Sequence, residues 1–192
     1  NHLGYDHYSY YLVLRDLGRI KVLALGQYKL RLGMGLVMNT DFGFGKLMTL
    51  NSLGRSTNSV RANTSRSSAN YLQGAASTVS ILKGLDLTAF VSYRPFDATL
   101  NESGTIRTIL KTGYHRTVSE LNRKNNAHQF TSGGNLHWEA SGFHAGITAI
   151  YCHVDKSLQP QTSQLYRLYY PSGSNFWNAS LDYGYMNYRL SF

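Results

Sequence analysis

The sequence predicts an all-β protein: an antiparallel transmembrane β-barrel, or a contiguous section of a larger one, with long extracellular loops and short helical inserts. Three observations support this fold class. Every even position from Ile20 to Met38 is apolar or glycine, and a period of two is that of a strand with one apolar face. Short turns alternate with long connections, as in membrane-spanning barrels. No stretch approaches the roughly 18 apolar residues that a membrane-spanning helix needs.

The first predicted hairpin pairs a strand over residues 5–16 with the strand that starts at Ile20. The turn between them, residues 17–19, is short enough for a tight hairpin. The second strand is about twice the mean strand length of five to six residues. It is therefore either one long strand or two strands with a bend at Gly33 and Gly35.

The segment after this strand is expected to be irregular. Glycines and an aspartate in residues 41–46 end the strand, since these residues break regular pairing. For residues 47–69 we predict a short helix or coil followed by a polar loop. A connection of this length is unusual inside a compact domain and is commonly functional or disordered.

A second hairpin is predicted over residues 71–93, where residues 71–82 lead to a turn at Lys83-Gly84 and residues 85–93 alternate after it. A long connection, residues 94–126, follows. Within it, Thr117 and Glu120 have the spacing of a capping box, which predicts a short helix through Arg123.

The last third of the chain predicts a third hairpin and a final strand. The third hairpin pairs residues 127–140 with residues 143–155 across Ser141-Gly142, and its second strand alternates. The strand over residues 175–192 carries Tyr183, Tyr185 and Tyr188 in a position typical of an aromatic girdle. Its alternation slips near Gly184, which predicts a bulge there.

Polar residues occupy odd positions of the strand that starts at Ile20. If the apolar face of this strand meets lipid, the polar face lines the lumen, because Lys or Arg facing lipid at the midplane costs roughly 2–4 kcal/mol. There it would attract anionic solutes or a plug segment, or simply pair with lumen acids such as Asp86 or Asp182. A soluble lipocalin-like barrel reverses this geometry and buries the even-numbered face. The residues of this basic stripe are Lys21, Gln27, Lys29 and Arg31.

The formal net charge of +9 reflects basic residues that gather in the predicted loops. They could contact nucleic acid, lipopolysaccharide phosphates or an acidic partner, or form solvated loops without a partner. These basic loop residues are Arg55, Arg61, Arg66, Lys111, His115, Arg116, Arg123 and Lys124.

Motifs for cofactors and catalysis are missing. The glycines around Met34 and Phe44 lack the spacing of a phosphate-binding loop. The histidines stand singly without metal-binding spacing, and there is no nucleophile motif. We therefore predict no cofactor and no metal, and a protein that is not an enzyme. An outer-membrane hydrolase with His7 or His144 as base is the alternative, since catalytic groups can converge across a barrel.

The chain also resembles a family of large outer-membrane β-barrel proteins of Gram-negative bacteria, labelled helix-hairpin-helix domain-containing proteins. The resemblance spans nearly the whole chain, and its G-x-Y plus L-G-x-G-L-V cluster is fairly specific. The segments that carry it are LALGQYKLRLGMGLVMNTDFGFGK, VSYRPFDATL, KTGYHRTVSELNRKNN and LYRLYYPSGSNFWNASLDYGY. The family's molecular role is not well defined, and its label suggests DNA uptake by analogy only.

The resemblance implies that residues 1–192 form a single β-barrel region within a larger barrel of the outer membrane. The alternating, aromatic ending at Phe192 resembles a barrel-assembly signal and would instead suit a closed eight-stranded barrel; we favour continuation. The expected function is passage across that membrane or docking of partners there, with DNA binding or uptake as the alternative. Expected partners are outer-membrane lipid and lipopolysaccharide, other outer-membrane or periplasmic proteins, and nucleic acid.

Overall fold

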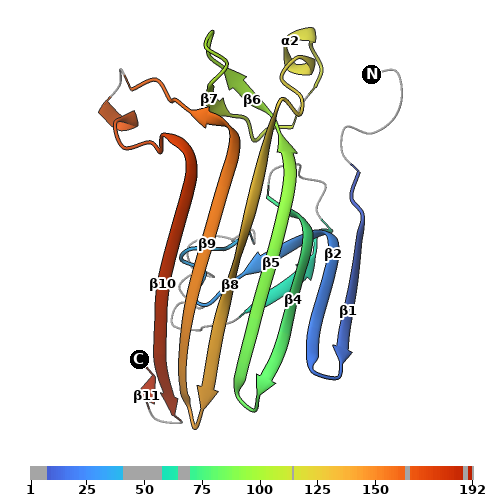
Figure 1. Cartoon of the computed structure of the whole chain (residues 1–192), viewed down its shortest axis with the longest axis vertical. Coiled ribbons are helices and arrows are strands. Elements are labelled where there is room, and N and C mark those ends of the chain that lie inside the picture. Colours follow the sequence, from blue (N-terminus) through green and yellow to red (C-terminus); the bar gives the residue numbers. More distant parts are fainter. Residues whose placement is uncertain are drawn as a thin grey trace.

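The described residues fold into one curled sheet, which is open along one side (Figure 1). The fold is known from a computed structural model, and the all-β, antiparallel prediction is confirmed. The predicted strand end at residues 41–46 and much of the 47–69 segment lie outside the described residues. The structure describes residues 8–40, 58–64, 70–113, 115–162, 165–187 and 190–191.

All three predicted hairpins are confirmed. Each joins two long antiparallel strands through a tight turn at the same end of the sheet (Figure 1). Their strands are β1 (Tyr11–Leu17) and β2 (Ile20–Arg31), β4 (Leu72–Leu82) and β5 (Leu85–Phe96), and β8 (Ala127–Ala140) and β9 (Phe143–Leu158).

The sheet has the strand order β1-β2-β4-β5-β8-β9-β10-β11, in which β10 spans Gly173–Asn187 and β11 spans Leu190–Ser191. Hydrogen bonding between sequential hairpins produces this order. Among the described residues no pairing joins β1 to β10 or β11, so the sheet is a half-barrel and not a closed barrel. None of the described helices is long and apolar enough to cross a membrane.

The long second strand ends at Arg31 and the chain turns at Gly33 and Gly35, where the bend was predicted, but among the described residues only an isolated bridge between Arg31 and Asn39 follows in place of a second strand. Its ladder stops at Arg31, Gly33 takes a positive φ of 54°, and the Leu32 amide donates to the Met38 carbonyl at 3.0 Å. A short strand, β3 (Ser59–Ala62), pairs with the end of β2. We did not predict β3, because its polar SVRA sequence has little apolar alternation.

The turned segment and β3 pack against one face of the curled sheet, which we call the inner face. Leu30, Leu32 and Val60 are buried there in one cluster with Phe90 of β5 and Ile150 of β9. Tyr28 belongs to the same cluster. The even-numbered, apolar face of β2 therefore lies inside the curled sheet and does not reach its outer surface.

Short elements decorate the end of the sheet opposite the tight turns. The strands β6 (Ala98–Leu100) and β7 (Ile106–Ile109) form a small hairpin that the sequence did not predict. The predicted helix is confirmed as α2 (Val118–Leu121) with its complete capping box. A 3-10 turn, η1 (Leu165–Arg167), precedes β10.

The bulge predicted at Gly184 is wrong. Gly184 pairs with His144 in unbroken register, and the irregularity in this ladder falls between Gly173 and Asn175, at the other end of β10. A glycine on the inner face needs no bulge, because β10 continues its alternation through it. The apparent slip in the sequence arose because Gly184 has no side chain that would mark a face.

Candidate membrane-facing surface

The outer face of the curled sheet, opposite the turned segment, carries an apolar band across strands β5, β8, β9 and β10. The central row of this band consists of four aliphatic residues that stand directly opposite one another in neighbouring strands, with Ile147 55% and Leu181 74% exposed. The adjacent row consists of alanines and a glycine. The central row is Leu87, Leu136, Ile147 and Leu181.

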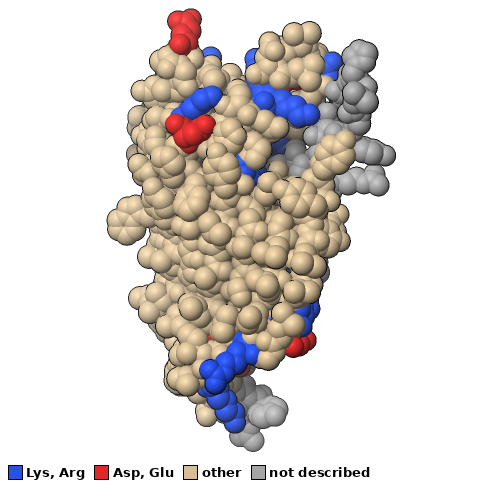
Figure 2. Space-filling view, turned by 45° about the vertical axis from the view of Figure 1, so that its right-hand side comes forward, with Lys and Arg blue, Asp and Glu red and all other residues tan. Residues whose placement is uncertain are grey.

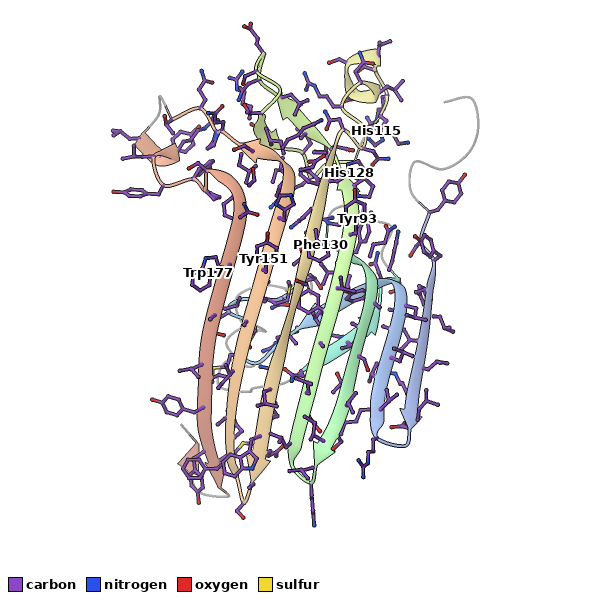
Figure 3. The ribbon with its side chains drawn as sticks, viewed as in Figure 1. Tyr93, His115, His128, Phe130, Tyr151 and Trp177 are labelled. Carbon is purple, nitrogen blue, oxygen red and sulfur yellow. The ribbon has the colours of Figure 1, made fainter. Side chains whose placement is uncertain are left out.

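A row of aromatic residues borders this band on the side of the loops. Figure 3 shows these side chains crossing β5, β8, β9 and β10 in sequence. Tyr93 stacks on His128 at 5.5 Å between ring centroids, and Phe130 meets Tyr151 edge-on at 6.5 Å. The upper aromatic row consists of Tyr93, Phe130, Tyr151 and Trp177.

A second aromatic row lies on the same face near the tight turns. Phe143 and Tyr185 pack with ring centroids 4.8 Å apart, and both Trp138 and Tyr183 are exposed. We call Trp138, Phe143, Tyr183 and Tyr185 the lower aromatic row. Tyr183 and Tyr185 were predicted for an aromatic girdle, and Tyr188 lies outside the described residues.

The two rows are a constant distance apart along three strands. Phe130 and Trp138, Phe143 and Tyr151, and Trp177 and Tyr185 are each eight positions apart in the sequence. At about 3.3 Å per residue this is about 26 Å along a strand. The apolar band of transmembrane barrels is about 25 Å tall between its two aromatic girdles.

Charged residues avoid the band. Figure 2 shows Lys, Arg, Asp and Glu gathered toward the two ends of the face in view, with a broad zone of other residues between them. A contiguous apolar surface of this kind is unusual on a monomeric soluble protein and marks a membrane or protein contact. The outer face thus carries an uncharged apolar zone between two charged ends.

The inner face of the same strands carries buried polar side chains beside the apolar residues Phe90 and Ile150, and these polar groups are hydrogen-bonded. Thr88, Asn135 and Thr148 are each at most 1% exposed. Asn135 donates through Nδ2 to Thr148 Oγ1 at 2.8 Å and accepts from Asn58 Nδ2 at 2.6 Å. Thr78 and Thr88 share a further hydrogen bond of 3.0 Å. Buried polar groups need such partners to offset their desolvation.

The structure does not bring the four residues of the basic stripe together. A register shift after Ile20 places Lys21 next to Asp86, with its Nζ 2.5 Å from the carboxylate. Gln27 is buried and donates to the Tyr8 carbonyl at 3.0 Å. Lys29 and Arg31, both half-buried, lie on the part of β2 that pairs with β3.

The basic loop residues separate into two groups. Arg61 lies on β3, directly opposite Lys29. Lys111 and Lys124 line one cavity at the loop end of the sheet together with the buried His115. In the sequence, Arg116 lies just before α2 and Arg123 just after it, next to the cavity residues His115 and Lys124. Arg55 and Arg66 lie outside the described residues.

Of the two histidines proposed as the base of a hydrolase, the structure describes only His144. His7 lies outside the described residues. His144 is on the inner face beside His137, with ring centroids 6.2 Å apart. Across the part of the chain that the structure describes, no group of three or more His, Cys, Asp or Glu residues is placed to hold a metal ion.

No protein-family model matches the chain, and comparisons with curated proteins and with solved structures found no significant match. The functional argument therefore starts from the two faces of the sheet. The sequence analysis missed the upper aromatic row, although the eight-residue spacing of aromatic residues in three separate strands could have indicated it.

Proposed function

We propose that this chain is part of the wall of a transmembrane β-barrel in the outer membrane of a Gram-negative bacterium. The single observation that carries the proposal is the uncharged outer band bordered by two aromatic rows. Aromatic side chains of this kind favour the boundary between lipid and water, where their apolar rings and polar atoms are both satisfied. Strands β4, β5, β8, β9 and β10 have 11 to 16 residues, which reaches or exceeds the roughly 9–11 residues that span a bilayer.

In this proposal the wall acts without catalysis, in passage across the membrane or in docking partners at its surface. The polar side chains of the inner face support it, because a lumen that water or a polar solute fills needs hydrogen-bonding side chains. The turned segment and β3 would then occupy part of that lumen as a plug. The Gram-negative location and the larger barrel rest on the family resemblance of the sequence.

The experiment is to purify the full chain and compare its behaviour with and without detergent. We expect a β-rich circular dichroism spectrum only in detergent or lipid, and different gel migration of boiled and unboiled samples. A monodisperse, β-rich protein in plain buffer would contradict the proposal. In that case the outer band would have to be a contact surface for another protein.

A further inference from the structure

A break in the sheet separates β1 from β5 toward the loop end. The ladder between β1 and β2 ends at Gly26, and the ladder between β4 and β5 ends at Gly74. Beyond these points β2 pairs with β3 and bends away from β1 toward the middle of the sheet (Figure 1). A Cβ at either position would lie 2.5 Å or less from a neighbouring carbonyl oxygen, so the departure needs glycine on both strands.

A cavity of about 420 Å³ lies at this break. Its borders are Tyr8 and Tyr10, which precede β1, the end of β5, and residues 109–111 and 124–125 at the loop end of the sheet. The volume lies near the lower end of the roughly 300–1,000 Å³ that small-molecule sites occupy. The cavity is therefore of a size for a small molecule.

Four aromatic rings line the cavity. Tyr8 and Tyr10 are each more than half exposed, whereas Tyr71 and Phe96 are buried. The lining thus combines accessible ring faces with a buried apolar wall. A flat aromatic face suits a ligand ring that has apolar C–H faces, and the phenol oxygens beside it suit polar groups on the edge of that ring.

The one acidic side chain in the lining is held by protein groups. Asp97 accepts from the Asn125 amide through Oδ1 at 2.8 Å, and its Oδ2 lies 2.8 Å from His115 Nε2. Both carboxylate oxygens are thus engaged. A cationic ligand would also meet three basic residues in the same lining, so the cavity disfavours positive charge.

The basic side chains of the lining do not form a cluster that is open to an anion. Arg94 lies over the Tyr71 ring, 5.4 Å from its centroid, and its Nη2 donates to Gln129 Oε1 at 3.4 Å. Lys124 also interacts with another residue of the chain. Lys111 is exposed and supplies one donor at the rim. The charged groups therefore leave the cavity best suited to a neutral ligand.

Uncharged polar groups make up much of the remaining lining, and hydrogen bonds hold them in place. Gln73 donates through Nε2 to the Tyr10 hydroxyl at 2.9 Å, which leaves the proton of that hydroxyl for a ligand. Gln27 donates through Nε2 to the Tyr8 carbonyl at 3.0 Å. Burial raises the pKa of the Tyr71 hydroxyl, so this group is a neutral donor at physiological pH. A site that is ordered before binding loses less entropy when it binds.

We propose that this cavity binds a neutral mono- or disaccharide. Sugar hydroxyls both donate and accept hydrogen bonds, as the amides and phenols of the lining require, and the C–H faces of a sugar ring can pack on Tyr8 and Tyr10. Gln73 and Tyr71 supply hydrogen bonds inside the cavity, and Lys111 supplies one at the rim. The inference goes beyond the proposed function and does not depend on the membrane location of the chain.

A ligand-observed NMR titration of the full chain tests the proposal, in lauryldimethylamine oxide because this detergent has no sugar headgroup. The probes are maltose, N-acetylglucosamine, the open-chain polyol sorbitol and anionic glucuronate. We expect at least one of the two neutral sugars to bind with saturation and a Kd below about 10 mM. Sorbitol has no ring to pack on tyrosine and should bind at least about tenfold more weakly. Glucuronate should bind no more tightly than the neutral sugars.

Two neighbouring tyrosines provide the test variant and its control. Tyr10→Ala removes an accessible ring and a hydroxyl from the lining, and we expect it to weaken sugar binding about tenfold. Tyr11→Ala removes a tyrosine that is also exposed but lies outside the lining, and it should leave binding unchanged. Tyr10→Phe keeps the ring and should give an intermediate loss.

Four results would overturn the saccharide site. These are no saturable binding of either neutral sugar, equal binding by Tyr10→Ala and the wild type, an equal loss in both alanine variants, or tighter binding of glucuronate than of the neutral sugars. The last result would make this a site for anions. Heat-dependent gel migration of the same samples reports on the membrane function separately. A chain that keeps this migration but gives any of the four results refutes the saccharide site alone.

Discussion

The outer and inner faces of strands β5, β8, β9 and β10 differ in the side chains that they carry and in how these side chains are partnered. On the inner face, buried threonine and asparagine side chains bond to one another. On the outer face, aliphatic side chains lie exposed between two aromatic rows. A soluble sheet buries its apolar face and wets its polar one. The exposed apolar band is the observation on which we base the proposal that the outer face meets lipid.

The largest effect should follow from a charge in the centre of the outer band. Ile147→Arg places a guanidinium between the aromatic rows, and we expect it to lower the free energy of unfolding in lipid vesicles by about 2–4 kcal/mol. His153→Arg, on the same face of β9 but beyond the band, should cost about 0–1 kcal/mol. Urea titrations of both variants in vesicles measure the difference. Equal stability of Ile147→Arg and the wild type would contradict the proposal that Ile147 faces lipid.

A pair of neighbouring substitutions sharpens the comparison, because Asn135 and Leu136 point to opposite faces of β8. Asn135→Leu removes the hydrogen bonds to Thr148 and Asn58, which should cost about 1–3 kcal/mol. Leu136→Asn should cost a similar amount, about 1–3 kcal/mol, only if its face is in lipid. In a water-exposed position the same change should stay within about 0.5 kcal/mol. Unfolding of the two single variants and the double variant in vesicles separates these cases.

The smallest effect concerns the decorated end of the sheet, where the residues of α2 are not buried. Amides of Arg116 and Thr117 donate to the Glu120 carboxylate and lower its pKa. The folded pKa is depressed, so Glu120 stabilises α2 above its unfolded pKa, about 4.3, and this contribution is lost as the pH falls through the folded value. Hydrogen exchange of the α2 amides, corrected for intrinsic rates, should show this loss, and Glu120→Gln should abolish the pH dependence. A pH profile that is the same in both proteins would contradict the capping role.

The sequence predicted the hairpins because each has a two- or three-residue turn and at least one clearly alternating arm. The capping box was equally local, since Thr117 and Glu120 contact each other within one turn of helix. Elements that depend on distant partners were missed. The strand β3 forms against the end of β2, and β7 contacts β9 at Leu158. Neither partner is visible in the local pattern.

The direction of each face was also beyond the sequence. Both β2 and β9 alternate, yet β2 buries its apolar positions Tyr28 and Leu30 under the turned segment, whereas β9 exposes Ile147 and Tyr151. A period of two defines two faces and does not say which one meets the interior. The cavity residues were missed for a similar reason. Arg94 and Lys124 line the same cavity at the loop end of the sheet, although they are thirty positions apart in the sequence.

The central claim, that the outer band meets lipid, is tested most directly by the chain's two tryptophans, Trp138 and Trp177, one in each aromatic row. Single-tryptophan variants Trp138→Phe and Trp177→Phe would be folded into vesicles whose lipids carry bromine at defined depths. We predict quenching of each tryptophan by shallow bromine. In the double Phe background, Ile147→Trp should be quenched most by the deepest bromine. Emission that no brominated lipid quenches would contradict the account.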